Sequence, residues 1–349
     1  MRRCWISSGL LVALLLVLTL PSAVRAQAQT EYTEVCRFAD TRLAEISGLT
    51  RSVRHPNVLW ALNDSSGGPF LYAVDERSCE ILARLRLAGA QARDFEAIAA
   101  GRDARGRPTI WVGDIGDNRD SWPSVQVLAV REPKRLSDRT VPIRPWSFTY
   151  ADRPHDAETL LADPASPRLW VVTKQLASGA LVSLAPVLDG GTSTREVSRV
   201  GGLVTDGAIS PDGSRYVLRD YVDARIFSGP PPGRELQRIA LPAQPQGEAI
   251  TWSAAGDALL IASEGDDRLL RIPVPVESRP TAEPTSEPTS GPTTKPTSGP
   301  TAESTLPSTG PPPAVTIVLV LLAVVALSVL MLIAERARRR DGTAESPEQ

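Results

Sequence analysis

The chain has 349 residues, and its 38 lysines and arginines against 40 aspartates and glutamates give a formal net charge of −2. Proteins that bind nucleic acid concentrate positive charge, so this balance predicts no nucleic-acid partner. Hydrophobic residues make up 42% of the chain, which excludes a wholly disordered protein and is enough for a sizeable folded core.

The first 28 residues have the three-part pattern of a secretory signal peptide. Arg2 and Arg3 are followed by an apolar run over 10–20 and by small residues near 24–28. The apolar run is short for a membrane span, and small residues stand at both candidate cleavage points. We therefore predict a signal peptide over 1–28 and an exported chain; an N-terminal membrane anchor is the alternative.

Residues 29–275 form the predicted ectodomain, and this region contains an internal repeat. Ser47, Glu96, Glu158, Gly207 and Glu248 occupy equivalent places in five segments, at spacings of 49, 62, 49 and 41 residues. Each segment has the composition of four short β-strands separated by turns. This pattern is typical of a β-propeller, so the sequence predicts an all-β fold of five blades. Six blades are the alternative, because the second segment has room for an insertion.

The ends of the repeat region indicate how the ring closes. The last repeat stops after its third strand, and an additional strand over 31–40 precedes the first repeat. Such a strand can complete the last blade, which removes exposed sheet edges. Cys36 lies on this strand, and Cys79 lies at a turn of the first repeat. Because oxidation is expected outside the cell, we predict a Cys36–Cys79 disulfide; two buried free thiols are the alternative.

The composition changes after the repeats. Residues 276–313 are rich in Pro, Ser and Thr, with a proline at every fourth position from Pro280 to Pro300, which favours an extended, semi-rigid stalk. Residues 314–334 carry no charge and are numerous enough for a transmembrane helix. Arginines follow at once and mark the cytoplasmic end, so 335–349 is the predicted cytoplasmic tail.

The stretch LPSTG at 306–310 stands just before this apolar run. An LPxTG motif followed by an apolar span and basic residues resembles the cell-wall sorting signal of Gram-positive surface proteins. The motif residues are Leu306, Pro307, Ser308, Thr309 and Gly310. The resemblance implies that a sortase cuts between Thr309 and Gly310 and joins the chain to peptidoglycan. A plain single-pass anchor on the extracellular face is the alternative.

Acidic side chains recur where the first strand of a repeat begins and where the second strand ends. Because neighbouring strands run in opposite directions, these positions share one face of a propeller and meet at one mouth of its channel. The candidates are Asp64, Glu96, Asp114, Asp117, Asn118, Asp156, Glu158, Asp206, Glu248 and Glu264. Carboxylate and amide oxygens suit Ca²⁺, so a calcium-dependent site is one interpretation. The alternative is that these side chains accept hydrogen bonds from backbone N–H groups in turns.

Candidates for catalysis are few. Glu158 and the neighbouring His155 are the two we consider, because a histidine beside acids at the mouth can act as a general acid or base. A solvated loop histidine is the alternative interpretation of His155. The ectodomain sequence contains no GxSxG elbow, HExxH motif, P-loop or CxxC pair.

The strings EISGL, ALNDS, DFEAIA, GDIGDN and GEAIT resemble bacterial secreted β-propellers of the phytase-like and TolB-like superfamily, over roughly 40–275. The resemblance implies an esterase-like activity and often a six-bladed ring. Calcium-dependent propeller phytases hold calcium ions and phosphate at an acidic channel mouth. The positions that would carry this are Glu96, Asp114, Asp117, Asp156, Glu158 and Glu248. The sequence departs from that pattern in its basic residues, since only Lys174 and Arg219 stand at equivalent strand ends.

Three functions are therefore open. The first is a surface-displayed propeller that binds an extracellular ligand or protein partner, with Ca²⁺ as a possible cofactor. The second is a calcium-dependent hydrolase that acts on phosphoesters or esters. The third is a purely structural protein of the cell wall. The first is favoured because few basic residues stand at the predicted channel mouth and because the sequence has no recognisable nucleophile.

Overall fold

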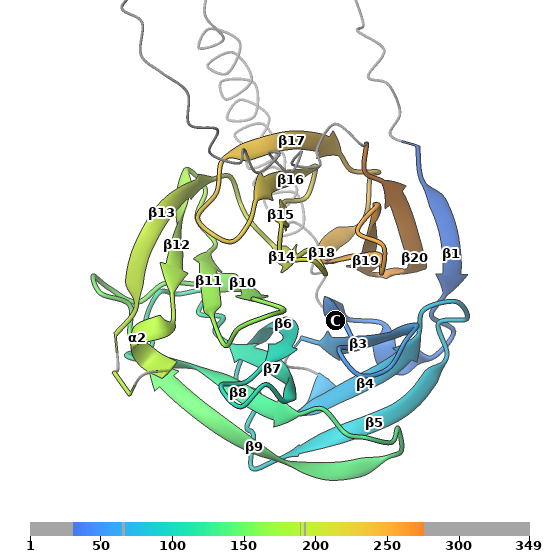
Figure 1. The fold of residues 1–349 in the computed structure, drawn as a ribbon, viewed down its shortest axis with the longest axis horizontal. Coiled ribbons are helices and arrows are strands. Elements are labelled where there is room, and N and C mark those ends of the chain that lie inside the picture. Colours follow the sequence, from blue (N-terminus) through green and yellow to red (C-terminus); the bar gives the residue numbers. More distant parts are fainter. Residues whose placement is uncertain (1–30, 65–66, 189, 192, 276–349) are drawn as a thin grey trace, which may run out of the picture. The chain divides into compact units, whose positions relative to one another are not determined.

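The computed structural model describes residues 31–64, 67–188, 190–191 and 193–275. These residues form an all-β fold that is built from five four-stranded antiparallel units (Figure 1). The first two units comprise β2 (Ile46–Arg51), β3 (Val58–Asn63), β4 (Phe70–Asp75), β5 (Ile81–Ala88), β6 (Phe95–Arg102), β7 (Pro108–Asp114), β8 (Val125–Arg131) and β9 (Arg139–Phe148). A parallel pairing of β5 with β9 joins these two units into one sheet.

The remaining units follow in chain order. The third and fourth comprise β10 (Ala157–Ala162), β11 (Leu169–Thr173), β12 (Ser178–Ser183), β13 (Arg195–Gly201), β14 (Asp206–Ile209), β15 (Arg215–Arg219), β16 (Asp223–Ser228) and β17 (Glu235–Ala240). The fifth comprises β18 (Gln246–Trp252), β19 (Ala258–Glu264), β20 (Asp266–Pro273) and β1 (Thr33–Arg37). The short helices η2 (Thr41–Leu43) and α2 (Ala185–Leu188) lie in connections.

The first strands of the units surround the centre of a ring. Neighbouring first strands contact one another in the cyclic order β2, β6, β10, β14, β18 and back to β2, as Figure 1 shows. The burial pattern explains this placement. Strands β3 and β10 are buried at every position, whereas β5 alternates between buried and accessible residues. A strand that is apolar on both faces is covered on each side by a neighbouring unit. A strand that is apolar on one face lies at the outside of the ring, where its other face is accessible to solvent.

The hydrophobic core of the described residues is divided into five clusters, and each cluster lies between two neighbouring units. Trp60 packs between the first and second units, Trp111 between the second and third, and Trp252 between the fourth and fifth. Burial of this apolar surface holds each unit against the next. The ring of units, in the arrangement of a β-propeller, confirms the predicted all-β propeller-like fold.

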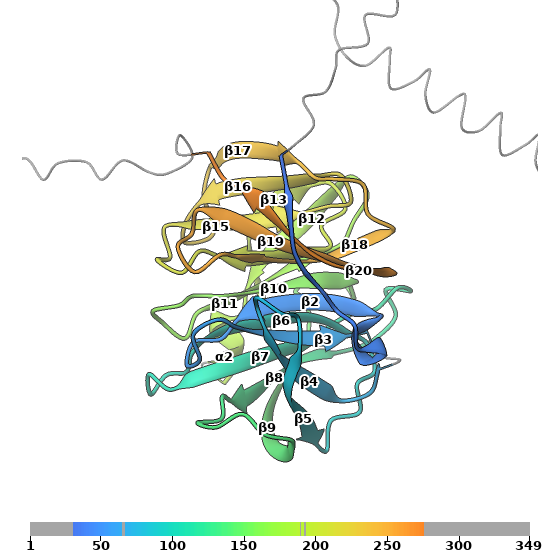
Figure 2. The ribbon, with the colours of Figure 1, turned by 90° about the vertical axis from the view of Figure 1, so that its right-hand side faces the viewer.

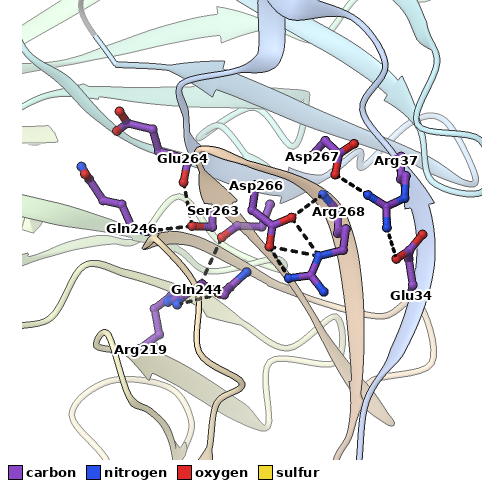
Figure 3. A network of polar contacts seen from close by, with 11 residues as sticks. Glu34, Arg37, Arg219, Gln244, Gln246, Ser263, Glu264, Asp266, Asp267 and Arg268 are labelled. Atoms are coloured by element: carbon purple, nitrogen blue, oxygen red, sulfur yellow. Dashed lines mark hydrogen bonds and ion pairs between the residues drawn. The ribbon is translucent and has the colours of Figure 1, made fainter.

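The ring closes through the strand that precedes the first repeat. Strand β1 pairs antiparallel with β20, with Thr33 opposite Arg271, and the side view in Figure 2 shows β1 along the last unit. Arg37 Nη1 donates to Asp267 Oδ1 at 2.7 Å across this pair (Figure 3). A disulfide joins Cys36 on β1 to Cys79 in the turn before β5, with a Cα–Cα distance of 5.7 Å. The bond links the last unit covalently to the first.

The 62-residue spacing between Glu96 and Glu158 had left room for a sixth blade, but the described residues between them form no additional four-stranded unit. Strand β9 is ten residues long, and an irregular connection leads from Phe148 to β10. These segments take up the extra length.

Several predicted segments lie outside the described residues: the signal peptide over 1–28, the stalk over 276–313 with LPSTG, the apolar run over 314–334 and the tail over 335–349. Within the described part of the chain, no helix has the length and apolar character that crossing a membrane requires. The structure therefore leaves these predictions as they stand.

Candidate functional site at the channel mouth

One face of the ring carries a cavity of about 470 Å³, which we call the mouth cavity. Its lining residues are Asp64, Glu96, Asn118, Glu158, Lys174, Tyr221, Pro245, Gln246 and Glu248. All five units contribute to this lining, from the beginnings of first strands and from the residues that follow second strands. Antiparallel neighbours place these positions at the same end of the sheet. Five of the ten predicted site residues, Asp64, Glu96, Asn118, Glu158 and Glu248, thus share one cavity.

The glutamates of the mouth cavity bind protons unusually tightly. Burial raises the pKa of Glu96 to about 10, and the negative charges of Glu158, Asp94, Asp64 and Glu248 add to the effect. Burial also raises the pKa of Glu158 to about 8, although Lys174 opposes this rise, and it raises the pKa of Glu248. Like charges in a low-dielectric site disfavour ionisation. The cavity therefore favours any cation that can replace these protons.

Lys174 is the cation in the lining of the mouth cavity, and it is already paired. Its Nζ donates to Glu158 Oε1, and it lies 5.9 Å from the centre of the Tyr221 ring. Burial alone would lower the pKa of Lys174, but the Glu158 carboxylate outweighs burial and raises it. Gln246 Nε2 donates to Glu248 Oε1 at 2.7 Å. Glu158 and Glu248 thus each have one polar partner in the cavity wall.

Asp64, Asp94 and Glu96 form the tightest acidic group at this face. One carboxylate oxygen of each lies within 4.8 Å of those of the other two. Sequence reasoning did not select Asp94, which directly precedes β6. The register of β6 against β7 shifts between Phe95 and Ala97, so the simple alternation of strand faces does not hold there and gave no signal for Asp94.

A glycine permits this group to form. A Cβ at Gly116 would lie 2.6 Å from Asp94 Cγ and 2.7 Å from Glu96 Cγ. Gly116 belongs to the GDIGDN loop, so the loop backbone packs directly against both carboxylates. A side chain at this position would force the two acids to move from these places.

Four predicted site residues lie outside the mouth cavity because their carboxylates bind backbone N–H groups. Asp114 is fully buried and accepts from Asp94 N at 2.9 Å, and Asp206, also fully buried, accepts from Ile250 N at 2.7 Å. The prediction that Asp114, Asp117, Asp156 and Asp206 face the channel mouth is therefore wrong. The alternative interpretation holds for them, because their carboxylates accept hydrogen bonds from backbone N–H groups.

The other two of these four belong to one loop network. Asp117 accepts from the backbone N of Ser121 and of Trp122, each at 2.6 Å. Asp156 in turn accepts from Asp117 N at 2.8 Å. Glu264, at the end of β19, is outside the cavity lining as well, and burial raises its pKa. These acids shape the loops around the mouth cavity.

His155 also lies away from the mouth cavity. It is 6% exposed and lines a separate cavity of about 140 Å³ together with Tyr150. Its Nε2 lies 2.9 Å from Asp152 Oδ1, and its Nδ1 lies 2.7 Å from the side-chain amide of Gln175. The expected position of His155 beside the acids of the mouth is therefore corrected, because its ring packs edge-on against Tyr150, with 5.0 Å between the ring centres.

Arg219 is the second basic residue that the sequence placed at this face, and it is fully buried. Its Nη1 donates to the carbonyl oxygen of Ala249 at 3.0 Å. Its Nη2 donates to Gln244 Oε1 at 3.1 Å, and Figure 3 shows these two side chains. A Cβ at Gly247 would lie 1.9 Å from Nη2, so this glycine makes room for the guanidinium. Burial lowers the pKa of Arg219 to about 10. Arg219 holds the fourth unit to the fifth and does not line the mouth cavity.

No protein-family model and no curated protein matches the chain. Among solved structures, a chain of the mitotic checkpoint complex matches with 17% identity and a TM-score of 0.35, covering 65% of this chain and 60% of that one. The PQQ-bound aldose sugar dehydrogenase from Streptomyces coelicolor matches with 11% identity and a TM-score of 0.41, covering 70% of this chain and 98% of that one. The chain thus spans about 60% of the first of these structures. At these identities and TM-scores, neither likeness bears on function.

Proposed function

We propose that this protein is a surface-anchored extracellular β-propeller that binds a ligand or protein partner at the mouth cavity, with Ca²⁺ as a cofactor. The observation that supports it is the meeting of Glu96, Glu158 and Glu248, from three different units, in one cavity where burial, together with the charges of neighbouring acids, raises all three pKa values. The extracellular and surface-anchored part of the proposal rests on the predicted signal peptide and on the LPSTG motif with its apolar run.

The acidic group at the mouth fits a calcium ion. Asp64, Asp94 and Glu96 supply hard oxygen ligands, and Ca²⁺ binds such ligands at about 2.3–2.6 Å. Two oxygens on one ion can be at most about 5 Å apart at these bond lengths, and the three carboxylates satisfy that limit at 4.8 Å. A bound Ca²⁺ would neutralise these acids and offer an electrophilic centre to oxygen atoms of a ligand. Asp64, Asp94 and Glu96 would hold it, and Glu158 and Glu248 would orient the ligand.

A calcium-dependent phytase-like phosphoesterase or esterase is the second candidate function. The pKa of Glu158, about 8, suits a general acid near neutral pH. A phosphate site also needs basic side chains that can pair with the ligand. Lys174 is bound to Glu158, and Arg219 is buried among carbonyl oxygens, so neither is available in this arrangement. This is why we place binding before hydrolysis.

Thermal unfolding of the full-length chain in detergent, with added Ca²⁺ and with EDTA, tests the metal part of the proposal. A ligand that binds only the folded state stabilises it by about 2.7 kcal/mol at a hundredfold excess over its Kd. We expect Ca²⁺ to raise the Tm by several degrees, and Asp94→Asn to remove this rise. Glu31→Gln, at an exposed position outside the mouth cavity, is the matched control and should keep it. An equal Tm with Ca²⁺ and with EDTA would contradict a calcium site.

Turnover of p-nitrophenyl phosphate and p-nitrophenyl acetate decides between the two functions. We expect no calcium-dependent turnover of either compound. Turnover that Glu158→Gln abolishes, while the protein remains folded, would favour the hydrolase over the binding protein.

A further inference from the structure

We propose a second binding site on the outer side of the ring, at the contact of the second and third units, which takes a small carboxylate carried on a ring. The site is a cavity of about 440 Å³, here called the arginine cavity. The residues used below are Arg131, Arg144, Trp111, Trp146, Ile143 and Leu188, all of which line it. It shares no lining residue with the mouth cavity.

Strand register brings these side chains onto one face of the second unit. Trp111 on β7 lies opposite Ala129 on β8, and Ala129 lies opposite Arg144 on β9. Arg131 and Trp146 are each two residues from one of these positions, so they share the same face. Leu188, at the end of α2, comes from the third unit and borders the cavity. The site therefore exists only where the two units pack together.

The cavity carries an excess of positive charge. Its lining contains the arginines 105, 107, 131 and 144 and a single acid, Asp103, which is a formal charge of +3 from four positive groups and one negative group. Arg107 Nε donates to Asp103 Oδ2 at 2.7 Å, so this pair is satisfied. Within the described residues Arg131 has no ion pair, and the guanidinium of Arg144 lies 4.4 Å from the centre of the Trp146 ring. In a chain whose net charge is −2, this is a local concentration of cations.

A buried donor without a partner is the second, independent observation. Trp111 is 2% exposed, and its Nε1–H has no hydrogen-bond acceptor among the described residues. An indole N–H can only donate, and a buried donor without an acceptor costs about 1–3 kcal/mol. Trp111 lines the arginine cavity, with its ring centre 5.5 Å from that of Trp146. A small tilt of the indole toward the cavity would bring this N–H within reach of an acceptor atom of a ligand.

The lining indicates the chemical class of the ligand. Guanidinium groups bind carboxylates through two parallel hydrogen bonds, which Arg131 and Arg144 can supply. The rest of the wall, with Trp146, Ile143 and Leu188, is apolar and suits the flat or C–H face of a ring. The volume is that of a small-molecule site, for which about 300–1,000 Å³ is usual. The chemistry is that of a ring-bearing carboxylate, whose ring comes either from an acidic sugar or from an aromatic acid.

Isothermal titration of the full-length chain in detergent tests this site with three probes at constant ionic strength: sodium glucuronate, sodium 4-hydroxybenzoate and sodium phosphate. We expect one of the two ring carboxylates to bind at least about tenfold more tightly than phosphate, since phosphate has no ring to pack on the apolar wall. Which of the two binds identifies the source of the ring. Phosphate that binds as tightly as both carboxylates, or no binding of either carboxylate, would overturn the proposal.

Variants locate the binding. The double variant Arg131→Gln/Arg144→Gln changes two exposed side chains and should weaken carboxylate binding about tenfold or more. Trp111→Phe keeps the aromatic bulk but removes the N–H, and should weaken it by a smaller factor. Arg234→Gln, an exposed arginine of the fourth unit, is the control and should bind like the parent chain. Unchanged affinity in the double arginine variant would sink the assignment, even if Trp111→Phe failed to fold.

Discussion

The ammonium of Lys174 donates to the carboxylate of Glu158 inside the mouth cavity. This pair joins the beginning of β10 to the end of β11 within one unit, so it is built by a single hairpin. It leaves Glu96 with no ion pair in the described residues and with other acids around it. The cavity therefore retains an excess of acidic groups after its lysine is paired. This excess is what makes a bound cation favourable there.

Removing the lysine should destabilise the protein through the acid that it leaves behind. Both side chains are largely buried, with 18% of Lys174 and 7% of Glu158 exposed. We expect Lys174→Met to cost on the order of 2 kcal/mol at pH 8, because Glu158 must then either stay ionised without its partner or take up a proton that it does not hold in the unfolded chain. Denaturant unfolding measures this, and the double variant Lys174→Met/Glu158→Gln should recover most of the loss. A double variant no more stable than Lys174→Met alone would contradict this account.

Glu96→Gln should stabilise the calcium-free protein as the pH rises. The folded-state pKa of Glu96, about 10, lies above its ordinary value of 4.5. Stability from the protonated group is thus fully present below pH 4.5 and decreases as the pH rises toward 10. Glutamine stays neutral throughout, so in EDTA the variant should match the parent Tm near pH 4 and exceed it by several degrees at pH 8. The same Tm at pH 8 would show that Glu96 ionises there without cost.

Gly116→Ala should separate the acidic pair at the start of β6. The new Cβ would lie 2.6 Å from Asp94 Cγ, closer than real Cβ contacts allow, so Asp94 and Glu96 must move. We expect a loss on the order of 1–3 kcal/mol in unfolding free energy and the loss of any stabilisation by Ca²⁺. Gly201→Ala is the matched control, because a Cβ there meets only the Ala177 carbonyl oxygen at 4.0 Å. Calcium stabilisation that survives in Gly116→Ala would place the ion elsewhere.

Removal of the disulfide should weaken the closure of the ring. The bond spans 43 residues, and a loop of this size is worth about 2–4 kcal/mol. We expect Cys36→Ala/Cys79→Ala to lose about this much in denaturant unfolding, and to lower the Tm accordingly. Reducing agent should lower the Tm of the parent chain and leave that of the variant unchanged. In a chain without the predicted signal peptide and its Cys4, two reactive thiols after unfolding without reduction would show that the bond is absent.

The sorting prediction concerns residues outside the described part of the chain. If a sortase joins Thr309 to peptidoglycan, Thr309→Ala blocks the transfer, and the protein remains anchored only by its apolar run. We expect the variant to be extracted from cells by detergent, whereas the parent chain needs digestion of the wall for release. Ser308→Ala is the control, because the motif accepts any residue at that position. Equal extraction of all three proteins would leave the plain membrane anchor as the better interpretation.

The sequence predicted the propeller because its evidence is local and periodic. Repeated four-strand segments, the additional strand over 31–40 and the two cysteines all appear as patterns along the chain. The strand order β1-β20-β19-β18 is the closure that the incomplete last repeat required. Alternation of strand direction likewise predicts that Glu96, Glu158 and Glu248 lie at one face.

Loop geometry limited the prediction of the site. Asp114 and Glu96 are both acids beside the mouth in sequence terms, but one accepts a backbone hydrogen bond and the other faces the cavity. Which of these occurs depends on the path of the neighbouring loop, and repeat spacing does not encode that path. Asp94 was missed for the same reason, since its role depends on the close approach of Gly116.

The sequence by itself determined the repeat, its all-β character, the closing strand and the face at which acids gather, because strand period and strand direction follow from local residue patterns. Only the tertiary structure decided which carboxylates share a cavity, that Arg219 is buried against Ala249, and that Arg131 and Arg144 line one cavity with Leu188 of the next unit. These contacts join residues of different units. They depend on how the units pack against one another, and the residue pattern within a single unit does not determine that packing.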